Sequence, residues 1–327
     1  MNIVVTGAAG FIGSRLSLRL LENGCRVTGI DCLTDFYAER IKRRNLAPLL
    51  GHKKFRWLNA DLNELPLRPL LRGADAVYHL AAQAGVRDSW GEQFDVYIRQ
   101  NIRATQRLLE AAKGLPLRRF VYASSSSVYG LTPDMPFKET SPLHPLSPYG
   151  VSKLAAENLA FLYFQNYGVP AVSLRFFTVY GPGQRPDMAF HKFLKAIHAG
   201  AAITVYGDGK QTRDFTYIDD IVSANLAALE RGRPGQVYNV GGGHRERLDR
   251  IFKVLASVCG RPPRLRRVAP QKGDVLHTFA DISKAERELG FAPRTGLADG
   301  LAAEWDYIQQ LYPLPASGQE AVKGTIS

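Results

Sequence analysis

The chain has 327 residues, of which 45% are hydrophobic and 22% charged, a composition typical of a globular protein long enough for two lobes. Its formal net charge of +12 is compatible with nucleic acid, a membrane surface or an acidic small molecule as the partner. The densest basic stretch, Arg261 to Arg267, contains two prolines and no interleaved aromatic residues, unlike a nucleic-acid recognition helix. We expect a solvated loop or rim there and no nucleic-acid binding, with part of the positive charge steering an anionic substrate.

The cysteines and the N-terminal segment indicate in which cellular compartment the protein is expected. Cys25, Cys32 and Cys259 have neither metal-ligand nor disulfide-framework spacing, which predicts no metal site and a reducing, cytoplasmic location. The opening segment MNIVVTGAAGFIG has no basic region and no long apolar core. We therefore expect neither a signal peptide nor a membrane span.

The first half of the chain alternates short apolar runs with helical patterns. Asn2–Val5 is predicted to be a buried strand, followed by a glycine turn and a helix that continues to about Asn23. Further predicted strands lie at Arg26–Ile30, Ala76–Leu80, Phe120–Ala123 and Ala171–Phe176, and further predicted helices at Asn101–Lys113 and Tyr149–Tyr167. This alternation predicts an α/β fold of the Rossmann type, a parallel sheet doubly wound by helices.

The pattern of predicted elements changes after about Arg175, where a loop rich in proline and glycine leads into short elements with longer connections. A strand at Val237–Val240 and a helix at Leu248–Val258 predict a smaller α/β lobe, interleaved with the first. We expect a first domain over residues 1–174 and a second over 175–312, with segments that return to the first. A polar tail over 313–327 is expected to pack poorly.

A glycine turn lies between the first predicted strand and the first predicted helix. Gly7, Gly10 and Gly13 allow the backbone to approach a pyrophosphate, whose charge the helix N-terminus stabilises. Asp31 ends the second strand, where its carboxylate can accept from a ribose hydroxyl pair and repels the 2′-phosphate of NADP. This context predicts an NAD site. Asp61 and Leu62 follow the third strand and are expected to bound the adenine.

Tyr149 and Lys153 are four residues apart on the predicted helix, so they lie on one face of it. An ammonium held near a phenol favours the phenolate and lowers the pKa of the phenol. Because a tyrosine titrates near ~10 in isolation, such tuning is needed before it can act as a base near neutral pH. The pair therefore predicts a proton-transfer site.

Several motifs accompany this pair: His79-Leu80-Ala81-Ala82, Asn101, a serine run before Val128-Tyr129-Gly130, and Arg213-Asp214-Phe215. Together they resemble the extended short-chain dehydrogenase/reductase family of nucleotide-sugar epimerases and dehydratases, from Asn2 to about Tyr312. The resemblance implies that Tyr149 is the catalytic base, that Lys153 binds the nicotinamide ribose and tunes Tyr149, and that Ser125 bonds the reacting hydroxyl. It also implies a homodimer formed through the helices at Asn101–Lys113 and Tyr149–Tyr167.

Together, the glycine turn, Asp31, Asp61 and the family resemblance predict a full set of NAD contacts. The predicted NAD-binding residues are Gly7, Gly10, Phe11, Ile12, Gly13, Asp31, Asp61, Leu62, Leu80, Ala81, Ala82, Asn101, Ser124, Tyr149, Lys153 and Phe176.

The serine run separates the branches of the family. Related dehydratases carry an acidic pair before Val-Tyr-Gly, and related uronate decarboxylases carry one glutamate there, whereas this chain has Ser126 and Ser127. Water elimination needs a proton donor and acceptor at neighbouring carbons, so dehydration is disfavoured. Epimerisation requires none of these acids.

The segment from Arg175 to Met188 (RFFTVYGPGQRPDM) closely resembles that of the UDP-glucuronate 4-epimerases, as does the segment from His79 to Arg87. A uronate carries a C6 carboxylate, which calls for hydroxyl donors and a nearby cation. Ser126, Ser127 and Thr178 can supply the donors, and Arg185 can reach the carboxylate or another anionic part of the substrate.

By the same resemblance, Arg213 binds the diphosphate, Tyr206 lies near the uracil, and Arg87 faces the phosphates. Relatives carry Arg-x-Gly-Asp near the end of the substrate lobe, where this chain has Gln271-Lys272-Gly273-Asp274. The diphosphate-binding arginine of that motif is therefore replaced by Gln271. The predicted substrate-binding residues are Arg87, Ser125, Ser126, Ser127, Tyr149, Thr178, Arg185, Tyr206, Arg213 and Asp274.

These observations predict an NAD-dependent epimerase that interconverts UDP-glucuronate and UDP-galacturonate. A 4-epimerase of UDP-glucose or UDP-N-acetylglucosamine is the nearest alternative. A UDP-glucuronate decarboxylase or a nucleotide-sugar dehydratase fits less well because Ser127 replaces a glutamate. A non-enzymatic NAD-binding protein on this fold fits least, since Tyr149, Lys153 and the serine hydroxyl are all present.

Overall fold

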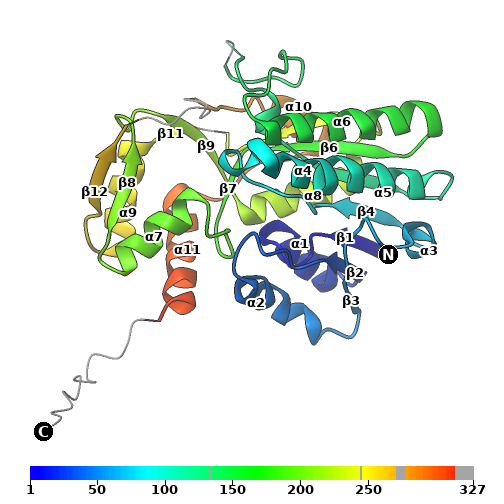
Figure 1. The fold of residues 1–327 in the computed structure, drawn as a ribbon, viewed down its shortest axis with the longest axis horizontal. Coiled ribbons are helices and arrows are strands. Elements are labelled where there is room, and N and C mark those ends of the chain that lie inside the picture. The colour runs from blue at the N-terminus through cyan, green and yellow to red at the C-terminus, as the bar shows by residue number, and fades with distance from the viewer. Residues whose placement is uncertain (133–134, 244, 270–276, 314–327) are drawn as a thin grey trace, which may run out of the picture.

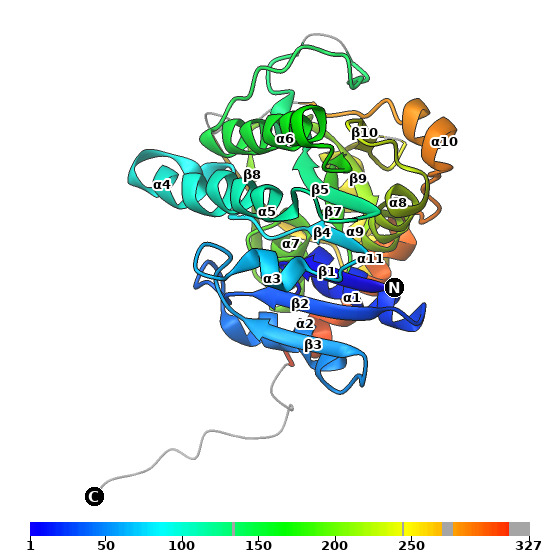
Figure 2. The ribbon, with the colours of Figure 1, turned by 90° about the vertical axis from the view of Figure 1, so that its right-hand side faces the viewer.

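The larger lobe is built on a sheet of seven parallel strands (Figures 1 and 2), seen here in a computed structural model that describes residues 1–132, 135–243, 245–269 and 277–313. The strand order is β10-β6-β5-β4-β1-β2-β3, so the chain reverses direction of travel between β1 and β4. Such a reversal leaves a crevice at the carboxyl ends of the strands. The strands are β1 (Asn2–Thr6), β2 (Arg26–Asp31), β3 (Phe55–Asn59), β4 (Ala76–His79), β5 (Arg119–Ser125), β6 (Ala171–Phe176) and β10 (Val237–Val240).

Helices cover both faces of this sheet because its strands are apolar on both sides. In β4, Ala76 and Tyr78 pack into one hydrophobic cluster and Val77 into the other. The first cluster is covered by α1 (Phe11–Glu22), α2 (Glu39–Leu50), α8 (Ile218–Arg231) and α10 (Ser283–Leu289). The second is covered by α3 (Leu67–Leu71), α5 (Ala104–Ala112) and α6 (Pro148–Tyr167).

The smaller lobe lies beyond the carboxyl ends of the central strands, at the left of Figure 1. Stacked aromatic rings help to hold it together, with the ring centroids of Phe190 and Phe215 4.5 Å apart. Its strands are β7 (Thr178–Tyr180), β9 (Thr212–Tyr217) and β11 (Arg245–Arg247) in one sheet, and β8 (Ala202–Tyr206) and β12 (Arg264–Val268) in another. Its helices are α7 (Ala189–His198), α9 (Leu248–Cys259) and α11 (Leu297–Leu311).

The predicted α/β fold with a doubly wound parallel sheet is confirmed, and the predicted strands agree with the observed ones to within one or two residues. The expectation of a loop at Arg261 to Arg267 is partly wrong, because Arg264–Val268 is strand β12, paired with β8. Its arginine side chains are exposed, as expected, and backbone pairing does not depend on them. The helix expected from Asn101 starts with a π-helical turn at Ile98–Arg103, which continues α4 (Phe94–Tyr97) into α5.

Strand β10 pairs with β6 in the central sheet, so the chain returns to the larger lobe after building much of the smaller one. Helices α8 and α10 return with it and pack on the central sheet. The division at residues 174 and 175 falls inside β6 and stays our proposal for the domains. Residues 314–327 of the predicted tail lie outside the described residues. Among the described helices, none combines the length and apolar character that a membrane crossing requires.

Candidate active site

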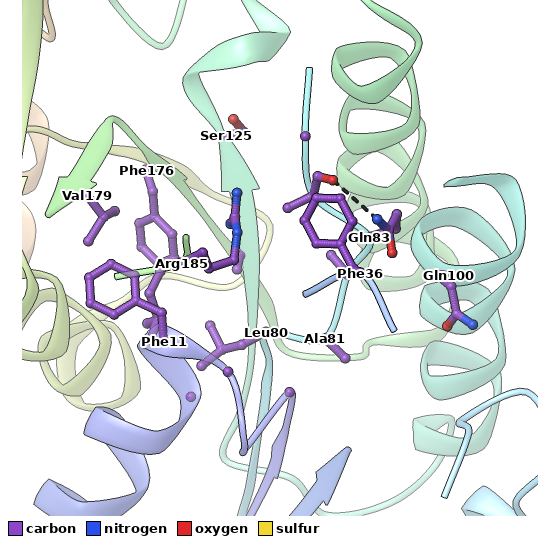
Figure 3. A pocket seen from close by; sticks show the side chains of 18 of the residues that line it. Phe11, Phe36, Leu80, Ala81, Gln83, Gln100, Ser125, Phe176, Val179 and Arg185 are labelled. Atoms are coloured by element: carbon purple, nitrogen blue, oxygen red, sulfur yellow. Dashed lines mark hydrogen bonds between the residues drawn. The ribbon is translucent and has the colours of Figure 1, made fainter. Parts of the chain in front are cut away.

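A cavity of about 410 Å³ opens at the carboxyl ends of β1, β2, β4, β5 and β6 (Figure 3). It brings together residues that are far apart in the sequence, as expected at the reversal point of such a sheet. The predicted residues that line it are Gly7, Gly10, Phe11, Ile12, Gly13, Asp31, Leu62, Leu80, Ala81, Ala82, Ser124, Ser125, Ser126, Ser127, Tyr149, Lys153, Phe176, Thr178 and Arg185.

The glycine turn between β1 and α1 forms one wall of the cavity. A Cβ on Gly7 would lie 2.7 Å from the Ala81 nitrogen, and a Cβ on Gly13 only 2.0 Å from the Gly7 carbonyl oxygen. Gly7 also has φ of 73°, a conformation that favours glycine. Gly10 is the N-cap of α1, whose first turn contains no acidic residue. The turn therefore presents a backbone surface without bulky side chains and a positive helix end, which fits the pyrophosphate of a dinucleotide.

Asp31 stands at the end of β2, at the edge of the same cavity. Its Oδ2 accepts from the Ala9 nitrogen at 3.2 Å and its Oδ1 from the Leu33 nitrogen at 2.9 Å. These bonds fix the carboxylate while leaving lone pairs on both oxygens for a diol. The charge, position and remaining acceptor capacity of Asp31 fit the ribose of NAD and oppose a 2′-phosphate.

Tyr149 and Lys153 lie in the first turns of α6 and line the cavity, with Lys153 buried and Tyr149 half-buried. The helix begins there because Ser147 accepts from the Gly150 nitrogen at 3.1 Å and Pro148 occupies the first turn. Ser125, at the end of the adjacent strand β5, forms a hydrogen bond with the Tyr149 phenol. The structure thus assembles the three predicted catalytic side chains in one place.

Burial raises the pKa of the Tyr149 phenol, and the hydrogen bond with Ser125 and the charge of Arg185 lower it. Asp187 opposes them and raises it. Arg185 was predicted to bind substrate, and here it is also a cation that favours the phenolate. The role of Lys153 in tuning Tyr149 stays a prediction.

Lys153 is held in an apolar setting, and this burial lowers its pKa to about 7. Its Nζ lies 4.6 Å from the centroid of the Tyr122 ring. Glu157, one turn further along α6, raises the pKa of Lys153. Glu157 is itself paired with Arg175, whose Nη2 lies 2.5 Å from its Oε1.

Arg185 extends in Figure 3 between Phe176 and Phe36 toward the end of the cavity where Ser125 lies. Its Nε and Nη2 donate to the two carboxylate oxygens of Asp187 at 3.0 and 2.9 Å. Its guanidinium carbon lies 5.9 Å from the centroid of the Phe36 ring. These contacts hold a cation beside Tyr149, inside the cavity.

The serine run surrounds the same end of the cavity with neutral hydroxyls. Ser125 ends β5, and its Oγ accepts from the Ser127 nitrogen at 3.1 Å, which shapes the turn of residues 126–128. Ser126, Ser127 and Thr178 line the cavity alongside it. The reacting end of the site therefore combines the Arg185 guanidinium with several hydroxyl groups.

Some predicted residues that the structure describes do not line this cavity. The carboxylate of Asp61 accepts from the Asn63 nitrogen at 2.8 Å and from Arg99 at 2.9 Å. Asn101 accepts from the Gln83 nitrogen at 2.7 Å and donates to Ser152 at 2.8 Å. Asn101 therefore links the loop after β4 to α6, and direct NAD contacts by Asp61 and Asn101 stay predictions.

The predicted nucleotide-binding residues lie further out. The guanidinium carbon of Arg87 lies 4.7 Å from the centroid of the Tyr206 ring, so a residue of the larger lobe meets one of the smaller lobe. Arg213 is on β9 and its Nη1 donates to the Thr212 carbonyl oxygen at 3.0 Å. Asp274 and its neighbours from Gln271 lie outside the described residues.

The structure adds residues to the cavity that we did not predict. Asp187 was part of the motif that contains Arg185, and Gln83 part of the motif that begins at His79, so their proximity had a sequence signal. Phe36, Tyr37 and Lys42 follow Asp31 without a recognisable pattern, yet all three line the cavity. The Nζ of Lys42 donates to the Thr34 carbonyl oxygen at 2.5 Å and lies 4.7 Å from the centroid of the Tyr37 ring, which anchors the loop after β2.

A doubly wound sheet with a glycine turn, an acidic residue after β2 and a Tyr-x-x-x-Lys pair beside a serine defines a nucleotide-dependent enzyme of the short-chain dehydrogenase/reductase type. The family model described as the NAD dependent epimerase/dehydratase family matches residues 3–241. The chain belongs to this family, as its motifs predicted, and NAD is its cofactor.

Known relatives match nearly the whole chain. The Bacillus subtilis (strain 168) protein named uncharacterized UDP-glucose epimerase YtcB is 45% identical, over 95% of this chain and 99% of its own. The UDP-glucuronate 4-epimerase of Thermodesulfobacterium geofontis is 39% identical over 91% and 93%. A crystal structure of the Bacillus cereus UDP-glucuronic acid 4-epimerase, in complex with UDP-glucuronic acid and NAD, has a TM-score of 0.93 at 45% identity over 95% and 100%.

Proposed function

We propose that the protein interconverts UDP-glucuronate and UDP-galacturonate by NAD-dependent epimerisation at C4 of the sugar. The observation that carries this proposal is the position of Arg185, a half-buried cation that lines the same cavity as Tyr149, Ser127 and Thr178. A carboxylate on the sugar provides a partner for that cation. The relatives named UDP-glucuronate 4-epimerase support the same substrate.

When bound, NAD would supply the hydride acceptor and donor for C4 of the sugar, so the reaction would have no net redox change. Tyr149 takes the proton of the C4 hydroxyl as the hydride leaves, and Ser125 bonds the same oxygen. The charge of Arg185 favours the phenolate that this step requires. After the 4-keto sugar has turned its other face, Tyr149 returns the proton to the oxygen.

The 4-keto form of a uronate is a β-keto acid and is prone to lose CO2. Loss is fastest when the bond to the carboxylate aligns with the π system of the ketone. An epimerase of this substrate must therefore hold the carboxylate in an unreactive orientation. The neutral donors Ser126, Ser127 and Thr178 suit this task, since a hydrogen bond to a charged group contributes roughly 1.5–3 kcal/mol.

A 4-epimerase of a neutral UDP-sugar is the second candidate. It is favoured by the 45% identity to the Bacillus subtilis relative, whose name assigns it to UDP-glucose. A neutral sugar provides no anionic group for Arg185, although Asp187 already satisfies part of that guanidinium. We therefore rank this function below the uronate epimerase.

The deciding experiment incubates purified, NAD-supplemented protein with UDP-glucuronate, UDP-glucose and UDP-N-acetylglucosamine in parallel and separates the products. We expect UDP-galacturonate from UDP-glucuronate, with at most slow turnover of the other two. Brisk turnover of UDP-glucose without turnover of UDP-glucuronate refutes the proposal. A UDP-pentose product identifies a decarboxylase instead, and a 4-keto-6-deoxy sugar identifies a dehydratase.

For the nucleotide of this substrate, we propose contacts from Arg213 to the diphosphate, Arg87 to the phosphates, and Tyr206 and Asp274 to the rest of the UDP group. The contact between Arg87 and Tyr206 across the two lobes supports a nucleotide site at that place. We likewise propose that the first domain, residues 1–174, binds NAD and that the second, residues 175–312, mainly binds the UDP-sugar.

We further propose a cytoplasmic homodimer. The three cysteines Cys25, Cys32 and Cys259 are free thiols, which suits a reducing compartment. Helix α6 exposes Phe161 and Leu162, each about half exposed, on the surface where a partner helix would pack. Light scattering of the purified protein should give twice the monomer mass, and Phe161→Asp should lower it.

A further inference from the structure

Tyr122 is a fully buried residue of β5 whose ring lies against the side chain of Lys153. The Lys153 Nζ is 4.6 Å from the ring centroid, and the Tyr122 hydroxyl donates weakly to the Lys153 carbonyl oxygen at 3.4 Å. On the neighbouring strand, His79 pairs with Tyr122 in register, with ring centroids 5.8 Å apart. The Tyr122 ring thus contacts both Lys153 and His79.

The carboxylate nearest to Lys153 along the helix is already engaged. Glu157 accepts from Ser124 at 2.6 Å and from Arg175 Nε at 3.1 Å through Oε2, and from Arg175 Nη2 at 2.5 Å through Oε1. Because Arg175 balances its charge, Glu157 attracts the Lys153 ammonium less than a free carboxylate would. His79 is neutral, since burial lowers its pKa to about 3. The negative face of the Tyr122 ring is therefore an important stabilising contact of the ammonium.

We propose that Tyr122 is a positioning residue, whose ring face holds the Lys153 ammonium charged and in place beside Tyr149. A desolvated cation over an aromatic face is attracted by the ring quadrupole, and the attraction is stronger than at an exposed site. The ring also blocks the space into which the lysine could turn. Tyr122 touches neither substrate nor cofactor in this role, and it acts through Lys153.

The other ionisable groups around this site come from several elements. Tyr149 and Glu157 lie on α6 itself, and Tyr97 packs its ring edge-on to that of Tyr149 from α4. The remaining groups are His79 on β4, Arg175 on β6, and the ion pair Arg185–Asp187 after β7. None of these is changed by a substitution within the ring at position 122, so the ring can be tested alone.

The test varies the quadrupole of the ring while keeping its shape. It uses the variants Tyr122→Phe and Tyr122→3,4,5-trifluorophenylalanine. Fluorination weakens the quadrupole without removing volume, so both variants should fold. Tyr122→Leu is a third variant that removes the ring. In NAD-loaded protein, the phenolate absorbance of Tyr149 is titrated against pH, with Tyr149→Phe subtracted as the blank. The pH profile of kcat for the UDP-sugar that the wild type turns over is measured in parallel.

We expect Tyr122→Phe to behave as the wild type. With trifluorophenylalanine, a smaller fraction of Lys153 is protonated and its positive charge stabilises the Tyr149 phenolate less. The Tyr149 phenol should therefore titrate at a pH higher by up to about one unit. The acidic limb of the kcat profile should move by the same amount, and KM should change little. The spectroscopic titration requires no turnover, so it stays decisive even if the proposed UDP-glucuronate activity fails.

The matched control is Tyr78→Leu, which removes an equally buried tyrosine from β4 on the opposite face of the sheet. It should lower thermal stability as Tyr122→Leu does, while leaving the Tyr149 titration unmoved. If the trifluorophenylalanine variant titrates as Tyr122→Phe does, the proposal is wrong. It is equally wrong if Tyr78→Leu and Tyr122→Leu shift the titration alike, because the role of Tyr122 is then structural.

Discussion

Arg185 and Asp187 form a two-pronged ion pair inside the cavity, with Nε–Oδ1 and Nη2–Oδ2 distances of 3.0 and 2.9 Å. The pair orients the guanidinium without using all of its five donors, so others remain for a ligand. The charge of Arg185 also lowers the pKa of Tyr149. One arginine is thus placed to act on the substrate and on the catalytic phenol.

Replacement of Arg185 by leucine should lower kcat/KM for UDP-glucuronate by about 10- to 100-fold, the loss of one charged hydrogen-bond partner. Because the charge of Arg185 lowers the pKa of Tyr149, its removal raises that pKa. Tyr149 acts as the phenolate, so the acidic limb of the profile moves to higher pH and the loss is largest at low pH. Steady-state kinetics across the pH range measure both effects.

Arg250→Leu is the control for this change, because Arg250 is an exposed arginine that pairs with Glu246 on the smaller lobe. It should leave the kinetics unchanged. An Arg185→Leu enzyme with full activity on UDP-glucuronate and an unmoved acidic limb would contradict both roles.

The hydroxyls of Ser127 and Thr178 are expected to prevent loss of CO2 from the 4-keto uronate. Ser127→Ala or Thr178→Ala should therefore increase the fraction of UDP-pentose among the products, which mass spectrometry detects directly. The control is Ser223→Ala, which removes a hydroxyl bonded to the Asp219 carbonyl oxygen on α8, away from the cavity. If neither variant increases the pentose fraction and epimerisation is unchanged, the two hydroxyls do not prevent loss of CO2.

Asp31→Asn tests the choice of cofactor. Asparagine can still accept from the Leu33 nitrogen, so the loop should keep its shape while the charge that repels a 2′-phosphate is lost. Lys42, whose charge interacts with Asp31, remains nearby. The ratio of NADP to NAD affinity should rise about 10-fold or more, about 1.4 kcal/mol, in titrations followed by protein fluorescence. An unchanged ratio would mean that Asp31 does not face the ribose.

Loss of the buried ion pair between Glu157 and Arg175 should lower the free energy of unfolding much more than loss of an exposed ion pair. Their side chains are 5% and 3% exposed, so Glu157→Gln leaves a buried guanidinium without its counter-charge. The free energy of unfolding should fall by about 3–5 kcal/mol in urea denaturation. Glu39→Gln, which breaks the exposed pair with Arg43 on α2, should cost about 0.5 kcal/mol or less. Similar losses in the two variants would refute this account.

Much of the fold could be predicted because it depends on local patterns. The apolar runs of β1, β2 and β6 and the capped start of α6 each carry their signal within a few residues. The strand β12 lacked such a signal, because its arginines are exposed and its pairing with β8 depends on backbone atoms that the rest of the lobe brings close. The π-helical turn before α5 is a similar case, since Asn101 there is fixed by contacts with Gln83 and Ser152.

The sequence by itself determined the chemistry of the site: the glycine turn, Asp31 and the Tyr149/Lys153 pair require fixed residue types at fixed spacings, so they can be recognised without coordinates. Only the tertiary structure decided what surrounds them. The ring of Tyr122 beside Lys153 and the approach of Phe36 to Arg185 join segments that no spacing relates. Burial and charge at these contacts set the pKa values of the catalytic groups, because both depend on which side chains the folded chain brings within a few ångströms.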